Sequence, residues 1–173
     1  MRIDNMQRKM AGIKNLRLYL ETTVFNYYFD VDRDGHKDTV RLFEAIGAGT
    51  YEGYASVHVT GELKRTTQEP KRSHMLALVE KYGIKILKDN AQSGALAALY
   101  IGNGIIPATY HLDSLHIAVA SVYDLDCVVS YNFAHINRAK TKILTAHVNR
   151  EAGYNGVVIC TSKEVLDDGL CDI

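Results

Sequence analysis

The sequence has few cysteines and prolines and no excess of charge of either sign. Its three cysteines, Cys127, Cys160 and Cys171, are odd in number and widely spaced, so they indicate neither a disulfide framework nor a zinc site. Only two prolines occur and 47% of the residues are hydrophobic, which argues against long disordered stretches. Lysine plus arginine equals aspartate plus glutamate at 20 each, so binding to nucleic acid would need a local basic surface.

Long hydrophobic runs are also missing. No stretch reaches the length of a membrane span, and the polar first 15 residues lack the hydrophobic centre of a secretory signal. We therefore expect a cytoplasmic protein without membrane contact, with residues 1–15 as a flexible extension and residues 16–173 as one domain. No P-loop or GxGxxG motif follows an expected strand, and no serine or cysteine has the partners of a nucleophile.

Strand-like and helix-like segments alternate along the rest of the chain. Runs of bulky apolar residues predict strands over residues 16–21, 51–57, 84–87, 127–130 and 156–160. Helical spacing of apolar residues predicts helices over residues 23–28, 39–48, 58–67, 73–82, 93–104 and 113–123, with Thr161 or Ser162 capping a final turn. This alternation predicts an α/β protein with a central parallel sheet and helices on both faces.

Polar residues at strand ends are the first candidates for a site, because ligands of such sheets bind beyond the carboxyl ends of the strands. Glu21 directly follows the first expected strand, and Asn132 follows the strand CVVS. Thr23 and Asn26 are spaced to keep their polar groups near Glu21. Simpler explanations stay open, since Glu21 can be a helix-opening acid and Asn132 a turn residue.

Two further acids lie in expected helices. Glu62 lies in GELKRT, where an exposed acid paired along the helix is the simpler explanation. Asp113 opens an almost wholly apolar helix, which is typical of a helix packed on more than one side, so its start is expected near the core. His116 follows one turn later, and a lone histidine on a helix is more often structural than a ligand.

Taken together, LYLETTVFNYYFD, GELKRT, LDSLHIAVA and VVSYNFAHINR resemble, in order and spacing, the four acidic-site segments of PIN-domain proteins. LAALYIGNGIIP and NREAGY are similar to one branch of that family, and the resemblance extends from Leu16 to Leu166. It implies a three-layer α/β/α PIN-like fold whose acids hold one or two Mg²⁺ or Mn²⁺ ions and cut RNA with metal-activated water. Many members are VapC-type toxins, usually dimeric and kept inactive by a small antitoxin.

By position, the resemblance implies catalytic roles for Glu21, Glu62, Asp113 and Asn132, with the three carboxylates binding metal. Glu21 and Asn132 both stand where aspartate is usual: the longer glutamate arm moves the ligand oxygens, and the amide offers an oxygen without charge. Thr23 matches a hydroxyl residue of the family.

The expected site chemistry follows from the charges. Clustered carboxylates repel one another unless a cation neutralises them, and Mg²⁺ prefers oxygen ligands. We expect Glu21 and Asp113 as direct ligands, Glu62 as a ligand or water-orienting group, and Asn132 as a group that orients metal-bound water. Supporting roles are expected for Thr23, Asn26 and His116, and phosphate contacts for Arg138 and Lys140.

The sequence therefore predicts a metal-dependent endoribonuclease with an RNA substrate, a small antitoxin partner and a homodimeric state. A second hypothesis stays open. Asn132 and the neutral net charge are also consistent with a catalytically weak or inactive PIN-fold protein that acts through protein or RNA binding.

Overall fold

The computed structural model describes residues 15–167, so the expected flexible extension lies outside the described residues except for Asn15. The described strands are β1 (Arg17–Leu20), β2 (Glu52–Ser56), β3 (Lys85–Leu87), β4 (Cys127–Val129) and β5 (Val158–Cys160). They form a sheet in the order β3-β2-β1-β4-β5 with parallel pairing throughout. This confirms the predicted central parallel sheet.

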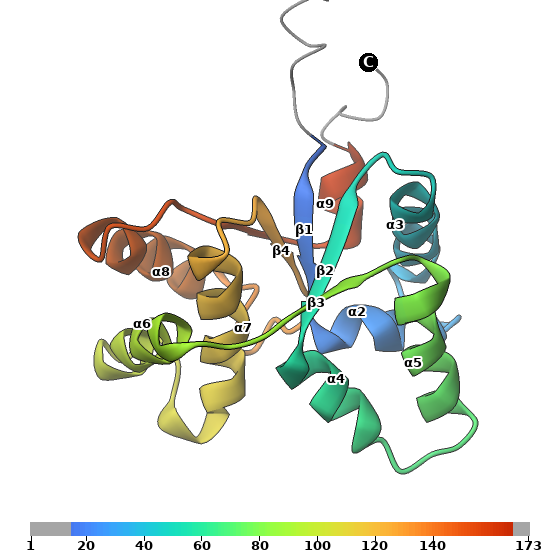
Figure 1. The fold of residues 1–173 in the computed structure, drawn as a ribbon, viewed down its shortest axis with the longest axis horizontal. Helices are drawn as coiled ribbons and strands as arrows, with labels where there is room; N and C mark the ends of the chain where they lie inside the picture. Colours follow the sequence, from blue (N-terminus) through green and yellow to red (C-terminus); the bar gives the residue numbers. More distant parts are fainter. Residues whose placement is uncertain (1–14, 168–173) are drawn as a thin grey trace, which may run out of the picture.

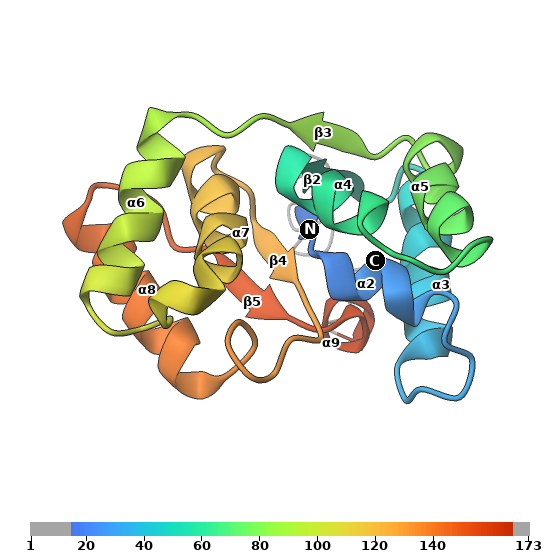
Figure 2. The same ribbon diagram turned by 90° about the horizontal axis from the view of Figure 1, so that it is seen from below.

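Helices cover both faces of the sheet, which gives three layers (Figures 1 and 2). One face carries α2 (Thr22–Tyr27), α3 (His36–Gly47), α4 (Val57–Lys64), α5 (Lys71–Lys81) and α9 (Ser162–Asp167). The other face carries α6 (Ala91–Gly102), α7 (His111–Val122) and α8 (Ala139–Glu151), with a 3₁₀ turn at Ala108–Tyr110 leading into α7. Among the described residues, no helix is long and apolar enough to cross a membrane.

The layers follow from the direction in which the chain builds the sheet. It first adds β2 and β3 on one side of β1, then crosses over to add β4 and β5 on the other side. Connections between parallel strands are right-handed, so this reversal puts the connecting helices on opposite faces. The strand order therefore reverses between β1 and β4.

The core lies around β1 and α7. Leu18, Tyr19 and Leu20 of β1 have no exposed surface, as expected for the middle strand of a covered sheet. Residues 116–120 of α7 are equally buried, which confirms that this helix is packed on more than one side. The helix begins at His111, two residues earlier than the sequence predicts.

The helix α8 is an element that the sequence pattern did not predict. Its buried face includes Thr141, Thr145 and Asn149 beside Val148, so polar residues occupy positions where apolar ones would mark a helix. The threonine hydroxyls form hydrogen bonds with nearby backbone carbonyls. For example, Thr145 Oγ1 donates to the Thr141 carbonyl at 2.7 Å. Buried hydrogen bonds thus occupy part of the face that α8 packs against the rest of the protein.

Candidate functional site

The candidate site lies beyond the carboxyl ends of β1 and β4, where the strand order reverses. Crevices at such reversals are where open parallel sheets bind ligands. Glu21 is the first residue after β1, and its backbone N–H donates to the Val129 carbonyl of β4 at 3.1 Å, which extends the strand pairing to this residue. Ser130 is the first residue after β4. The two residues therefore meet at the same edge.

The Glu21 carboxylate is buried and anchored through one oxygen. Its Oε2 accepts hydrogen bonds from Thr23 Oγ1 at 2.5 Å and from Ser130 Oγ at 2.8 Å, and the residue is only 3% exposed. Burial raises the pKa of Glu21, although the nearby His116 charge and the two hydroxyl donors act in the opposite direction. Deprotonated Glu21 is thus a buried charge that its surroundings only partly stabilise.

Glu62 comes from the helix that follows β2. Ser56 ends β2 and caps α4, since its Oγ accepts from the backbone N–H of His58 at 3.2 Å. This brings Glu62 Oε2 to Thr22 Oγ1 at 2.5 Å and to His116 Nε2 at 2.9 Å. Partial burial would raise the pKa of Glu62, but the His116 hydrogen bond and charge outweigh it and leave that pKa lowered.

His116 is fully buried, and both of its ring nitrogens have partners. Nε2 meets Glu62, and Nδ1 lies 2.8 Å from the Tyr19 hydroxyl, which in turn lies 2.6 Å from Ser56 Oγ. Because a carboxylate only accepts, Nε2 carries the proton. Burial would lower the pKa of His116, but the Glu62 hydrogen bond and the Glu21 charge outweigh it and raise that pKa. A hydrogen-bonded chain thus joins β1, β2, α4 and α7.

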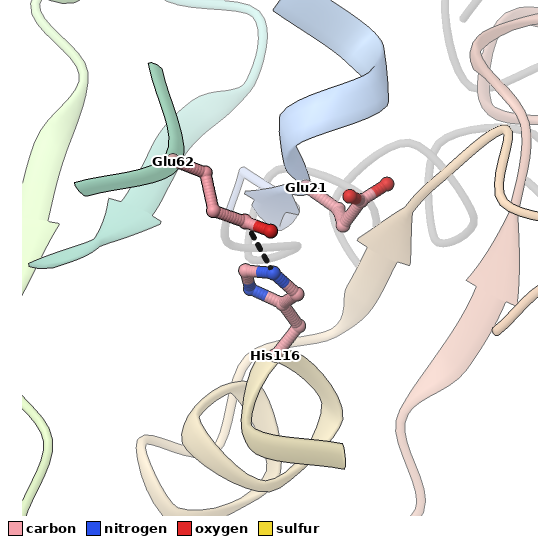
Figure 3. A group of neighbouring side chains, drawn as sticks. All are labelled: Glu21, Glu62 and His116. Carbon is pink, nitrogen blue, oxygen red and sulfur yellow. Dashed lines mark hydrogen bonds and ion pairs between the residues drawn. The ribbon is translucent and has the colours of Figure 1, made fainter. Parts of the chain in front are cut away.

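Glu21, Glu62 and His116 form a group with the spacing of metal ligands. One ligand atom from each lies within 4.8 Å of the others, and the side chains come from the end of β1, from α4 and from α7, with Glu62 and His116 pointing toward each other (Figure 3). Within residues 15–167, no hydrogen bond reaches the second oxygen, Oε1, of either glutamate. The two carboxylates therefore have free oxygens that fit a hard divalent cation, whereas the bonds of His116 suit it to orienting Glu62.

Asp113 lies one helical turn before His116 but outside the tight ligand group among the described residues. Burial raises its pKa, with the His116 charge and a hydrogen bond from Asn132 acting in the opposite direction. Asn132 also shapes its own turn, because its Oδ1 accepts from the His135 N–H at 3.0 Å. Asn132 thus orders its own turn and also interacts with the Asp113 carboxylate.

The remaining expected residues make local contacts. Thr23 bridges the site, since its hydroxyl donates to Glu21 and accepts from the Tyr131 N–H at 2.8 Å. Asn26 donates to the Thr22 carbonyl one turn earlier at 3.2 Å. Arg138 donates to the Ala134 carbonyl and Lys140 to the Gly104 carbonyl, both at 3.0 Å.

Three contributors were missed by the sequence reasoning: Thr22, Ser130 and Tyr19. Ser130 stands at the end of a strand, so the rule that selected Glu21 and Asn132 also applies to it. Thr22 adjoins Glu21 but contacts Glu62, and no sequence signal predicts that pairing across 40 residues. Tyr19 belongs to an apolar strand, where a tyrosine is indistinguishable from ordinary core packing.

Comparisons with known proteins agree with this architecture. No protein-family model matches the sequence, and no curated protein matches it. Among solved structures, the chain is similar to a VapBC2 chain from Rickettsia felis, in a complex bound to a DNA fragment from its promoter (TM-score 0.52, 17% identity, 83% of this chain and 97% of that one). It is also similar to Mycobacterium tuberculosis VapC20, a sarcin–ricin loop cleaving toxin (TM-score 0.50, 13% identity, 81% and 98% covered). The chain thus has the VapC-like PIN fold.

Proposed function

We propose that this protein is a divalent-metal-dependent endoribonuclease of PIN type that hydrolyses RNA phosphodiesters. The observation that carries the proposal is the buried carboxylate of Glu21 within ligand distance of Glu62, at the edge where such a sheet binds its ligands. The VapC-like fold supports the same activity, since one structural neighbour is a toxin that cleaves the sarcin–ricin loop.

Mg²⁺ or Mn²⁺ suits this donor set. Both glutamates offer a carboxylate oxygen, and a buried carboxylate whose pKa is raised by burial is stabilised in its charged form by a cation. When bound, the ion lowers the pKa of water and stabilises the charge that develops on phosphorus. In the proposed site, Glu21 and Glu62 offer the closest pair of carboxylates to the ion, and Asp113, which lies outside that tight group, is a further ligand that binds the ion directly or through water.

The other residues keep these groups in place. Ser130 and Thr23 anchor Glu21 through their hydroxyls, and Thr22 and His116 anchor Glu62. Asn132 orients Asp113 and a water molecule. Anchoring one oxygen of each glutamate restricts its rotamers, which reduces the cost of ordering the site when substrate binds.

The direct test is cleavage of RNA by the purified protein with Mn²⁺. We expect cleavage that stops with EDTA and falls at least about a hundredfold in Asp113→Asn and Glu21→Gln, since each removes a charged ligand. Glu44→Gln, which changes an exposed glutamate of α3, is the matched control and should retain activity. Equal cleavage by all four proteins would indicate a contaminating nuclease.

RNA binding in this proposal uses Arg138 and Lys140 at the start of α8. Replacing Arg138 by alanine should weaken binding to all RNA sequences. It should also reduce the slope of the logarithm of the binding constant against the logarithm of the salt concentration by about one, since one fewer phosphate contact is made. A filter-binding series at several salt concentrations measures both quantities. An unchanged slope would remove Arg138 from the interface.

The proposal includes a homodimer kept inactive by a small antitoxin. The support is the VapBC2 neighbour, a complex bound to promoter DNA. Light scattering of the purified protein tests the dimer, and co-purification with the product of the adjacent gene tests the antitoxin. If the purified protein is a monomer and no small protein co-purifies with it, the homodimer and the antitoxin are excluded and the nuclease activity alone remains proposed.

A second function, partner binding by an inactive PIN fold, is favoured by two observations. The fourth site position is the neutral Asn132, and the charge of Glu62 is already matched by His116. A protein that binds Mn²⁺ weakly and never cuts RNA, yet binds a protein partner, would support this function instead.

A further inference from the structure

A pocket lies beside the acidic group at the same edge of the sheet. It has a volume of about 300 Å³, large enough for a small ligand. Its lining comes from the end of α2, the loop before α3, the segment after β4 and the start of α9: Tyr27, Asp34, Asp38, Tyr131, Phe133 and Lys163. Tyr131 connects it to the acidic group, because its N–H donates to the Thr23 hydroxyl that also binds Glu21.

The floor of this pocket is rigid. The Tyr131 ring stacks on Tyr27 with ring centres 3.8 Å apart and planes 6° from parallel. Its hydroxyl donates to the Gly35 carbonyl at 3.3 Å and lies 3.0 Å from Thr39 Oγ1. Gly35 has a left-handed φ of 96°, and a Cβ there would lie 2.9 Å from the Tyr131 ring. The sequence thus uses glycine where the ring must approach the backbone.

Phe133 gives the pocket an exposed aromatic surface. It is 57% exposed and packs edge to face on Tyr131, with ring centres 6.3 Å apart. Single exposed apolar residues are ordinary on protein surfaces. Phe133 differs because a fixed aromatic pair supports it and because it lines a hollow next to the acidic group. Stacking on such rings is how proteins hold unpaired nucleotide bases.

The charged residues of the lining select among possible ligands. Asp34 and Asp38 accept hydrogen bonds and repel phosphate, although Asp38 also lies 3.6 Å from Arg41. Lys163 is the cation among the lining residues that the structure describes, and the Arg33 guanidinium lies 5.1 Å from the centre of the Tyr27 ring. Carboxylates favour a base edge that presents N–H groups. Guanine presents N–H donors from its ring and its amino group, whereas uracil presents two carbonyls and one N–H.

We propose that this pocket binds an unpaired base of the RNA substrate, next to the bond that is cut, and prefers guanine to uracil. The inference rests on the proposed ribonuclease function for its biological meaning, but base binding itself requires neither metal nor cleavage. In this arrangement Phe133 stacks on the base, Asp34 and Asp38 accept its N–H groups, and Lys163 contacts the attached phosphate.

The test is a titration of the metal-free full-length protein, followed by backbone amide chemical shifts. GMP, UMP and ribose 5-phosphate are compared, because all three carry the same phosphate. GMP should shift the amides of Gly35, Tyr131 and Phe133 in a saturable manner. UMP should bind at least about fivefold more weakly, and ribose 5-phosphate should leave these amides unchanged.

Two variants provide the matched comparison. Phe133→Ala should weaken GMP binding by about fivefold or more, through loss of base stacking. Ile143→Ala removes an apolar side chain that is 68% exposed on α8, outside the pocket lining, and should leave GMP binding unchanged. Equal weakening in both variants would contradict a specific role for Phe133.

The outcomes separate this inference from the proposed function. RNA cleavage without saturable GMP shifts would overturn the base pocket and leave the nuclease standing. Shifts that ribose 5-phosphate reproduces, or that appear only with a protein partner, would also overturn it. GMP binding without RNA cleavage would overturn the nuclease but not the recognition of a base.

Discussion

At Glu21 the chain places a carboxylate where water has little access. The two hydroxyl donors and the His116 charge stabilise its charged form, but burial still leaves the pKa raised. The folded-state pKa therefore lies above the unfolded one. In the metal-free protein, charged Glu21 destabilises the fold above that pKa, and the stability rises as the pH falls through it.

Replacing Glu21 by glutamine should therefore stabilise the metal-free protein. The amide oxygen can still accept from Thr23 and Ser130, while the buried charge is removed. Thermal unfolding in EDTA at neutral pH should show a higher Tm, by about 2–4 °C for each kcal/mol gained. Mn²⁺ should raise the Tm of the wild type and not that of the variant. A lower Tm for Glu21→Gln in EDTA would contradict the conclusion that the buried charge of Glu21 destabilises the metal-free protein.

The ion pair between His116 and Glu62 predicts a specific pH dependence. The pKa of His116 is raised above its usual value of 6.5, so its contribution to stability is complete below pH 6.5 and is lost as the pH rises through the folded-state pKa. The pKa of Glu62 is lowered, so its contribution is complete above 4.5 and is lost as the pH falls through its folded-state pKa. The ion pair therefore stabilises the fold most between pH 4.5 and pH 6.5.

His116→Gln should destabilise the metal-free protein more at about pH 5.5 than at about pH 9. Urea unfolding in EDTA at the two pH values measures the difference in the free energy of unfolding. His147→Gln, at an exposed position of α8, is the control and should show no such difference. An effect of His116→Gln that is equal at both pH values would mean that packing alone explains it.

Single residues also show what the sequence could predict about the site. The strand-end rule predicted that Glu21 lies at the carboxyl edge of the sheet, where the structure has it, because a residue's place at the end of a strand is a local property. The contact of Glu62 with Thr22 and His116 joins three segments, and its geometry depends on the packing of α4 against α7. His116 was expected in a supporting role, but its buried hydrogen-bonded chain was not predictable from one histidine in an apolar helix.

At the scale of elements, α8 is held by buried hydrogen bonds more than by apolar packing. Asn149 lies at the centre: its Nδ2 donates to Ser121 Oγ of α7 at 2.9 Å, and its Oδ1 accepts from the Tyr100 hydroxyl of α6. Single-sequence patterns depend on apolar periodicity, which these polar residues interrupt. The other α-helices were predicted, with boundaries differing by a few residues.

Asn149→Ala should destabilise the protein by about 1–3 kcal/mol, because it removes the close acceptor of the buried Tyr100 hydroxyl and the amide that donates to Ser121 Oγ. Asn103→Ala is the matched control, since Asn103 is exposed and donates only to a carbonyl of its own helix. Chemical denaturation of both variants gives the comparison. Equal and small losses would show that water replaces the Asn149 hydrogen bonds.

At the scale of the whole molecule, the fold was predictable and the exact site was not. Alternating strands and helices require a parallel sheet, and the reversal between β1 and β4 fixes the edge that carries the acids. The shared fold at 17% identity shows how little of this architecture depends on particular residues. The position of Asp113 outside the tight group depends on how α7 packs, which a sequence pattern does not specify.

The most direct test of the proposed metal site is calorimetric titration of Mn²⁺ into the wild type and Glu21→Gln, with Glu44→Gln as the control. We expect millimolar or tighter binding to the wild type and to Glu44→Gln, and its loss in Glu21→Gln, because that variant removes the charge of one of the two carboxylates that lie within ligand distance of each other. Absence of Mn²⁺ binding to the folded wild type would contradict the metal site and leave an inactive, partner-binding PIN fold as the better explanation.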